Sequence, residues 1–196
     1  MTDIKHINTI RQSGRQFLTS NNIQQLLKIK STRTLEDLIK RLVDGQILTQ
    51  LERNKYHVTN TTTSNFEIAQ FLYPPSYISF ETALNYHGIL SQFPTIITST
   101  SLKRSTTKTI NNITYSYTKL NSKTFTGYYK VGSYLIAQPA KALFDQLYLI
   151  TKSAKTEEYL DEMDYSNIDL AKITQYLKLI SNNRAKLITK LLIKYL

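Results

Sequence analysis

The segment Ser31-Thr32-Arg33-Thr34 carries the clearest recognition chemistry in this sequence. A guanidinium group can donate two hydrogen bonds to the edge of a guanine, and a threonine can contact a phosphate or the methyl group of thymine. Arg33 is therefore our candidate for a base contact. Basic side chains near this segment and farther along the chain would neutralise phosphates: Lys28, Lys30, Lys40, Arg41, Arg53 and Lys55.

Lys40 and Arg41 also have a structural explanation. Glu36 and Asp37 precede them by four residues each, and an acidic residue four positions before a basic one stabilises a helix. Bracing of the helix and contact with DNA are therefore equally good explanations for this pair. Phosphate would repel the two acids, and a protein-binding module is the alternative. The basic residues gather at the start of one predicted helix and at one hairpin tip, which favours DNA.

Catalytic side chains are sparse. The sequence has no cysteine, and its histidines, His6, His57 and His87, lie far apart, which excludes thiolate zinc sites and disfavours histidine ones. A magnesium nuclease is the enzymatic alternative, but it needs acids and a lysine on adjoining strands. The one Asp/Glu-x-Lys triplet, Asp3-Ile4-Lys5, falls in a predicted helix, and no phosphate loop or dinucleotide fingerprint is present. We therefore expect no catalysis, no metal and no cofactor.

The composition is that of a basic globular protein. Of 196 residues, 41% are hydrophobic and 20% are charged, and the formal net charge is +11. This charge points to a polyanionic partner or to a solvated basic surface. No apolar run approaches the roughly 18 residues that a membrane-spanning helix needs, and the N-terminal residues lack the apolar core of a signal peptide. We therefore expect a cytoplasmic protein with no membrane partner.

The recognition residues require a small domain that holds their helix in place. Isoleucines at helical spacing predict a first helix over residues 3–13, which Gly14 ends, and N-cap residues predict a second over residues 19–28. Ser31 can cap a third helix. Its buried stripe would consist of Leu35, Leu38, Ile39, Leu42 and Val43.

A hairpin should follow this third helix. Gly45 can supply a left-handed cap, and residues 47–51 and 55–59 have the composition of two strands joined by residues 52–54. The order of helix, helix, turn, helix and hairpin is typical of a winged helix-turn-helix. We therefore assign residues 1–60 to a DNA-binding domain of that kind.

The polar residues 60–65 predict a linker to a second domain, residues 66–196. Its pattern predicts a short helix over 66–72, an extended turn at Pro74-Pro75, and a helix over 80–87 that Ser79 caps and Gly88 ends. Further elements are expected as strands near 95–99, 108–110 and 113–118, strand character over 127–136, and a helix from Pro139 to Ile150.

Lys103, Arg104 and Lys108 lie in the strand-rich part of this second domain. A basic strand or loop could contact DNA or an acidic face of a partner protein. An ordinary solvated strand is an equally good explanation.

The C-terminal part should contain two helices after an acidic patch. Asn167 can cap the first, which carries apolar residues up to Ile180, and the second should run from Arg184 to the end. Their apolar content favours packing in the domain core over a groove for a partner. The acidic patch consists of Glu157, Glu158, Asp161, Glu162 and Asp164.

The second domain carries strings that occur together in one known family. They are Tyr73-Pro74-Pro75-Ser76-Tyr77-Ile78-Ser79, Ala83-Leu84, Tyr86-His87-Gly88, Lys103-Arg104 and Pro139-x-Lys141-Ala142-Leu143-x-Asp145 before Leu147-Tyr148. With the winged-helix pattern before them, they resemble the AbiEi-type antitoxins of type IV toxin-antitoxin (abortive infection) systems over nearly the whole chain. Gln138 and Ala140 depart from the family, which has a threonine and a glutamate there, and this departure concerns the start of a helix.

The resemblance implies a fold class and a function. The fold would be α+β, with an N-terminal winged helix-turn-helix and a mixed α/β antitoxin domain that ends in helices. The protein would repress transcription of its own operon and counteract a nucleotidyltransferase-type toxin, AbiEii. Its partners would be double-stranded DNA, as operator repeats upstream of that operon to which a monomer could bind, and the toxin, with or without direct contact. The alternatives are a regulator without a toxin partner and, less favoured, a DNA-acting nuclease.

Overall fold

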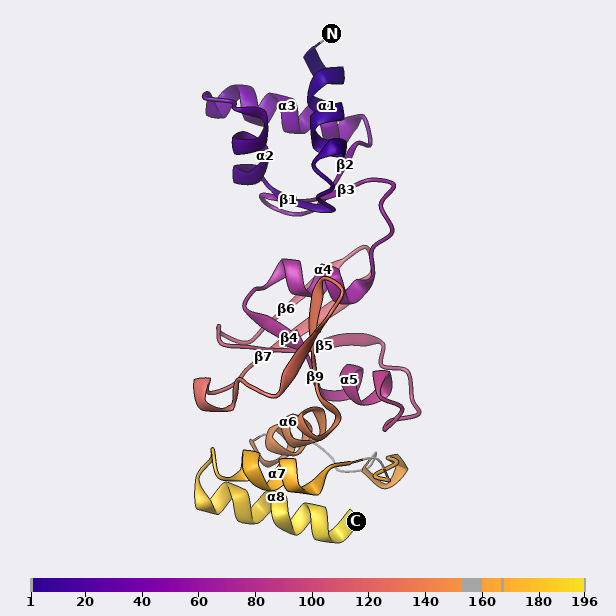
Figure 1. The fold of residues 1–196 in the computed structure, drawn as a ribbon, viewed down its shortest axis with the longest axis vertical. Coiled ribbons are helices and arrows are strands. Elements are labelled where there is room, and N and C mark those ends of the chain that lie inside the picture. Colours follow the sequence, from indigo (N-terminus) through magenta and orange to yellow (C-terminus); the bar gives the residue numbers. More distant parts are fainter. Residues whose placement is uncertain (1, 153–159, 167, 196) are drawn as a thin grey trace. The chain divides into compact units, whose positions relative to one another are not determined.

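The computed structural model describes residues 2–152, 160–166 and 168–195, which form an α+β protein. The chain divides into two compact units, Met1–Ser64 and Asn65–Leu196 (Figure 1), which we call unit 1 and unit 2. Glu157 and Glu158 of the expected acidic patch, and the expected helix cap Asn167, lie outside the described residues. In the part of the chain that is described, no helix is long and apolar enough to cross a membrane.

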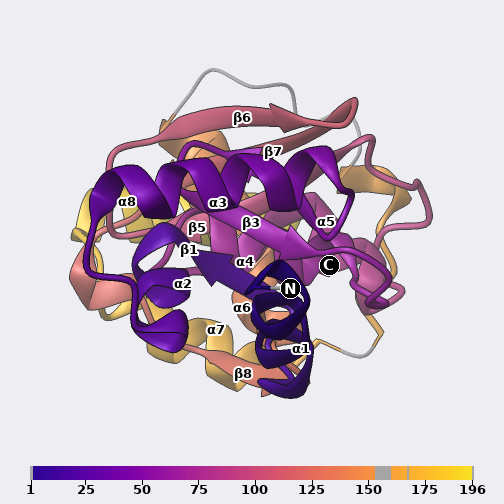
Figure 2. The same ribbon diagram turned by 90° about the horizontal axis from the view of Figure 1, so that it is seen from above.

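The described part of unit 1 forms helices and a three-stranded antiparallel sheet. The elements are α1 (Thr2–Gln12), β1 (Phe17–Thr19), α2 (Ser20–Leu27), α3 (Thr32–Asp44), β2 (Leu48–Glu52) and β3 (Lys55–Val58). β3 lies in the middle of the sheet, between β1 and β2. α3 runs across the direction of α1 (Figure 2).

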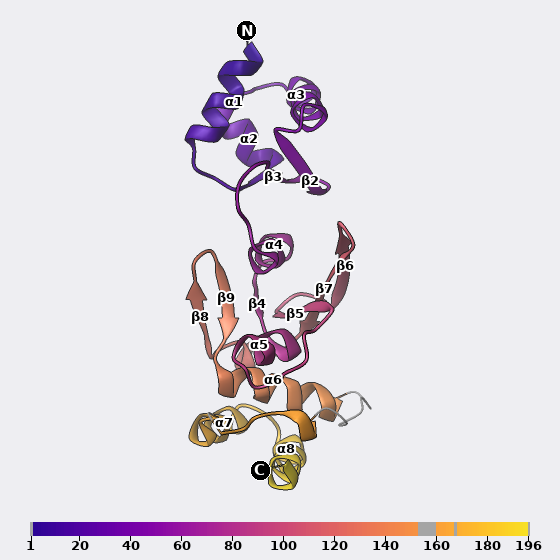
Figure 3. The same ribbon diagram turned by 90° about the vertical axis from the view of Figure 1, so that its right-hand side faces the viewer.

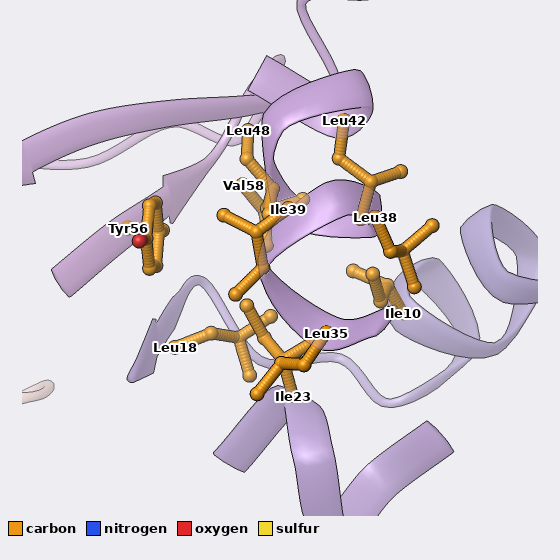
Figure 4. Packing of buried hydrophobic residues seen from close by; sticks show 10 residues of the cluster. All are labelled: Ile10, Leu18, Ile23, Leu35, Leu38, Ile39, Leu42, Leu48, Tyr56 and Val58. Atoms are coloured by element: carbon orange, nitrogen blue, oxygen red, sulfur yellow. The ribbon is translucent and has the colours of Figure 1, made fainter. Parts of the chain in front are cut away.

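The apolar stripe of α3 forms the centre of the unit 1 core. Four of its five predicted residues are buried, and Val43 is partly buried at the edge of the cluster. The burial of each such side chain contributes about 1.5–3 kcal/mol to folding, so the stripe fixes which face of α3 is left to solvent. The core cluster consists of Ile10, Leu18, Ile23, Leu35, Leu38, Ile39, Leu42, Leu48, Tyr56 and Val58 (Figure 4).

Polar caps set the starts of α2 and α3, as the sequence predicts. The Thr19 hydroxyl accepts a hydrogen bond from the Asn22 N–H, and the Asn22 side chain accepts one from the Thr19 N–H, both at 3.1 Å. This reciprocal pair is a capping box. The Ser31 hydroxyl accepts from the Thr34 N–H at 3.3 Å. Both caps satisfy N–H groups that have no partner inside their helices.

The predicted left-handed cap at Gly45 is wrong by one residue. Gly45 has φ −81°, whereas Gln46 has φ +56°. The Gln46 N–H donates to the Val43 carbonyl at 2.9 Å. The Ile47 N–H donates to the Leu42 carbonyl at the same distance. These two bonds form a Schellman motif in which Gln46 is the left-handed residue.

Strand β1 is absent from the sequence-based prediction. It has three residues and pairs with β3, with Leu18 opposite Tyr56. A strand this short has no periodicity of its own, and its formation depends on a partner distant in sequence. The two predicted hairpin strands are present as β2 and β3 with slightly different ends.

Unit 2 contains a six-stranded mixed sheet and helices that pack on it. In chain order its elements are α4 (Asn65–Leu72), β4 (Ser76–Ile78), α5 (Phe80–Tyr86), β5 (Ile96–Ser101), β6 (Thr106–Ile110), β7 (Ile113–Lys119), η1 (Ser122–Thr124), β8 (Tyr128–Val131), β9 (Tyr134–Ala137), α6 (Pro139–Lys152), η2 (Leu160–Glu162), α7 (Leu170–Leu177) and α8 (Asn182–Tyr195). The strand order is β6-β7-β5-β4-β9-β8. β5 is parallel to β7 and β4 is parallel to β9. α4 lies against β4, β5 and β9, and α7 and α8 pack on α6 (Figure 3).

The extended turn predicted at the two prolines continues into a central strand. Residues 76–78 form β4, whose side chains are all buried between β5 and β9. Three residues bordered by prolines and a helix give no strand pattern in the sequence, and here the pairing of neighbouring strands decides the structure.

The C-terminal helices differ from the prediction in their ends and in their burial. α7 is shorter than predicted, and its N-cap is Asp169, whose carboxylate accepts from the Lys172 N–H at 3.2 Å. α8 buries Ile188 and Leu192, so the predicted core packing is present on that face. Its opposite face is exposed and carries apolar as well as basic side chains.

Candidate nucleic-acid interface

The first turn of α3 presents its polar side chains to solvent. Thr32, Arg33 and Thr34 are exposed, as are Lys28 and Lys30 in the turn that precedes the helix. The Ser31 hydroxyl is occupied as the helix cap. The N-terminal end of a helix also carries a partial positive charge. The structure therefore brings together most of the residues that the sequence predicts for the start of this helix.

Farther along α3, acids alternate with bases on the exposed face. The exposed face of the helix, opposite the buried stripe, carries Arg33, Asp37, Lys40 and Asp44. Their spacing of three or four residues places them on the same side of the helix. The helix as a whole has as many acidic as basic residues. A polyanion would therefore be attracted to the first turn of α3 and not to its full length.

Arg41 is engaged by α1. Its Nε and Nη2 donate to the two carboxylate oxygens of Asp3 at 3.0 and 3.1 Å. The hydrogen bond from Arg41 is the main cause that lowers the pKa of Asp3, and it raises the pKa of Arg41. The sequence predicts bracing by Asp37, but the bracing partner in the structure is Asp3, which lies 38 positions away.

Of the two predicted basic residues of the hairpin, one forms an ion pair and the other is exposed. Lys55 is half-buried, and its Nζ donates to Glu52 Oε1 at 2.6 Å. Arg53 is exposed in the turn, next to Asn54. The Ser20 N–H donates to the Asn54 carbonyl at 3.2 Å, which ties this turn to the start of α2.

A hollow of about 560 Å³ lies among α2, α3 and the hairpin. Lys40 and Arg53 line it together with Thr32, and Glu36 and Asp44 line it as well. Lys40 therefore shares this surface with two acids, whose negative charges oppose its own.

Unit 2 gathers its predicted basic residues around one aromatic side chain. The Nζ atoms of Lys103 and Lys108 lie 5.3 and 5.5 Å from the ring centre of Tyr73. The Tyr73 hydroxyl donates to the Arg104 carbonyl at 2.8 Å, and its ring packs on Tyr117. Two lysines over one ring make a basic aromatic surface. Tyr73 was not among the sequence-predicted contacts, although its place before two prolines marks a fixed turn.

His57 has a structural setting. Its Nε2 lies 2.9 Å from the Thr61 hydroxyl and 2.7 Å from the Thr63 hydroxyl, and its ring packs on Phe17. These contacts fix the chain where it leaves β3.

A buried ion pair in α6 is the main polar feature that the sequence patterns do not predict. Lys141 and Asp145 are fully buried, and their Nζ and Oδ1 atoms are in direct contact. Tyr77 and Ser79 donate to Asp145 Oδ2 at 3.0 and 2.8 Å. Ser79 occupies the N-cap position of α5, but its hydroxyl makes this bond and no cap bond, which corrects its predicted role.

Burial sets the protonation behaviour of this pair. Desolvation raises the pKa of Asp145 and lowers the pKa of Lys141, and in each case their mutual attraction opposes it. Burial, followed by the neighbouring Asp145, holds the pKa of Tyr77 well above its usual value. A site of this kind, closed to solvent and with its carboxylate bonded by three donors, is a structural network.

The described residues contain no group of three or more histidine, aspartate or glutamate side chains placed to hold a metal ion. Fold and surface define a two-unit α+β protein that presents an exposed basic helix start in unit 1.

No family model matches the chain, and neither does any curated protein.

Proposed function

We propose that this protein is a sequence-specific DNA-binding regulator of transcription and that unit 1 is a winged helix-turn-helix. The observation that carries the proposal is the exposed first turn of α3, with Arg33 beside Lys28 and Lys30. The order of α1, β1, α2, α3, β2 and β3 is that of the winged-helix class, in which the third helix lies in the major groove.

Each side chain would have a distinct role. Arg33 would contact a guanine edge, with Thr32 and Thr34 at neighbouring bases or phosphates. Lys28 and Lys30 would contact phosphates, and Arg53 would reach the backbone or minor groove beside the hairpin. Glu36 and Asp37 would keep the later turns of α3 away from phosphate.

The cluster of Tyr73, Lys103, Arg104 and Lys108 is the part of unit 2 best suited to a second contact. Its lysines already lie over an aromatic ring, so their charges are held at one place. It would contact phosphates or an acidic face of a partner protein.

A salt titration tests the proposal. Fluorescence anisotropy should show that DNA from upstream of the gene binds more tightly than random duplex, with affinity that falls steeply as salt rises. Lys28→Ala should weaken binding to all DNA sequences alike. It should also reduce the slope of the logarithm of the binding constant against the logarithm of the salt concentration by about 1. Lys55→Ala should have a smaller effect, because Glu52 already binds that side chain. Equal affinity for upstream and random duplex would refute sequence-specific binding.

The antitoxin role depends on the resemblance to the AbiEi-type family. We propose that the protein represses its own operon and counteracts a nucleotidyltransferase-type toxin. Co-expression with the product of an adjacent nucleotidyltransferase gene should restore growth, and mixing the two purified proteins tests direct contact. A regulator without a toxin partner would bind its operator and leave toxicity unchanged.

A further inference from the structure

Three lysines form a line along the exposed face of α8. Lys186, Lys190 and Lys194 are spaced four residues apart, so neighbours are about 6 Å apart along the helix axis. Residues 182–195 contain no acid. Among the described carboxylates, none forms an ion pair with Lys186 or Lys190. Lys194 Nζ donates to the Tyr195 hydroxyl at 2.7 Å. Like charges at this spacing repel and destabilise a helix, so the line has an energetic cost at Lys186 and Lys190.

Apolar side chains flank the lysine line on both sides. Leu187 is 52% exposed and Ile193 is 78% exposed. They are six residues apart, which places them about 120° from each other around the helix axis. The lysines occupy the arc between them.

Two hollows adjoin this face of α8. One of about 640 Å³ lies between α8 and the end of α6, where Ile150, Leu187 and Leu191 line it. The other, of about 480 Å³, extends along α8 beside Ala185 and Ile193. Each apolar flank therefore has an adjacent depression that can receive a side chain.

We propose that this face of α8 docks an acidic amphipathic helix of another protein. Carboxylates four residues apart on such a helix repeat at the spacing of the lysines, and apolar residues beside them would cover Leu187 and Ile193. Charge complementarity gives specificity, and the burial of the apolar flanks gives affinity.

Other occupants fit this surface less well. A second copy of α8 would bring lysines against lysines, and such like-charge contacts are unfavourable. A membrane surface requires one continuous apolar face, but here the apolar residues stand on opposite sides of a charged line. Duplex DNA would meet the lysines and leave Ile193 without an apolar partner.

Binding of synthetic peptides to the full chain tests the proposal. The probe is a labelled helical peptide with glutamates at every fourth position and leucines beside them, and its control has the same composition in scrambled order. The ordered peptide should bind, and Lys186→Glu/Lys190→Glu should weaken it at least about tenfold because like charges would then oppose each other. The matched double variant Lys119→Glu/Lys130→Glu, which alters exposed lysines of β7 and β8, should leave the affinity unchanged.

A charge exchange separates this site from a general basic surface. A peptide with lysines in place of its glutamates should bind the Lys186→Glu/Lys190→Glu variant and not the original protein. Circular dichroism should show the same helix content in both double variants. The proposal is overturned if the scrambled peptide binds as tightly as the ordered one, or if Lys186→Glu/Lys190→Glu leaves the affinity for the ordered peptide unchanged. It is also overturned if the peptide does not bind and phosphatidylserine vesicles or random duplex DNA bind instead, with an affinity that Lys186→Glu/Lys190→Glu reduces.

Discussion

Arg33, Lys28 and Lys30 differ from Arg41 and Lys55 in what their cationic groups contact. Arg41 is held by Asp3 and Lys55 by Glu52, whereas the first three form no ion pair with any described carboxylate. A cation that already has a carboxylate partner must lose that partner before it can neutralise a phosphate. The contribution of each side chain to binding should follow this division.

Replacement of the base-contact candidate should reduce discrimination more than affinity for random DNA. We expect Arg33→Ala to lower the preference for the upstream sequence by about 1–3 kcal/mol, because a bidentate contact to guanine is lost. Competition anisotropy with upstream and random duplex measures this difference. Arg11→Ala removes an exposed arginine from α1 and serves as the control. An Arg33→Ala variant that keeps the full preference would show that another residue reads the sequence.

The buried pair in α6 should be sensitive to the loss of one partner. Lys141→Met alone leaves a buried carboxylate, and Asp145→Leu alone leaves a buried ammonium, so each should destabilise unit 2 by about 3–5 kcal/mol. The double variant should be less destabilised than the two single variants added together, since no charge is then left unpaired. Urea unfolding measures the three values. Simple additivity would show that the pair does not act as a unit.

At the scale of the elements, the ion pair between Asp3 and Arg41 joins α1 to α3. The folded-state pKa of Asp3 is lowered, so the pair stabilises the fold above the ordinary carboxyl pKa, near 3.8. That contribution is lost as pH falls through the folded-state value. We expect Asp3→Asn to lower the melting temperature slightly at pH 7 and to have a smaller effect as the pH falls below the ordinary carboxyl pKa. Both side chains are exposed, so added salt should reduce the difference at pH 7. A difference in melting temperature that does not shrink as the pH is lowered would contradict this account.

Local sequence patterns predict those helices and strands whose apolar periodicity and capping residues lie within or beside their own segment of the sequence. The apolar stripe of α3 recurs every three or four residues within a helix of thirteen residues, and its cap, Ser31, directly precedes that helix, so local patterns are enough to predict both. β1 and β4 have three residues each, and only pairing with distant strands makes them strands. The same limit applies to the candidate site. Its exposed start could be predicted from the position of Arg33, but the bond between Arg41 and Asp3 could not, because it depends on how α1 packs against α3.

At the scale of the whole molecule, each unit has a core of its own. The residues of the unit 1 cluster come from α1, α2, α3 and the small sheet. Residues 1–64 contain ten basic and five acidic residues, so this part of the chain is basic by itself. The proposed recognition of DNA by unit 1 and the proposed binding surfaces of unit 2 can therefore be tested in separate experiments.

A fragment of residues 1–64 should fold and keep its preference for the upstream DNA. We expect a cooperative thermal transition by circular dichroism, and a shallower dependence of affinity on salt if the lysines of unit 2 add contacts in the full chain. Lys103→Ala/Lys108→Ala in the full chain should then give the same shallower dependence. A folded fragment without sequence preference would assign part of the recognition to unit 2.

The burial of Lys141 has a practical consequence for following the opening of unit 2. Among the lysines that the structure describes, it is the one whose side chain is completely enclosed. An amine-reactive reagent should acylate the surface lysines quickly, while Lys141 reacts only after the packing around α6 has opened. The mass of the peptide that carries this residue, followed over time, would then report the opening rate of unit 2 from a single natural amine, without any label introduced into the protein.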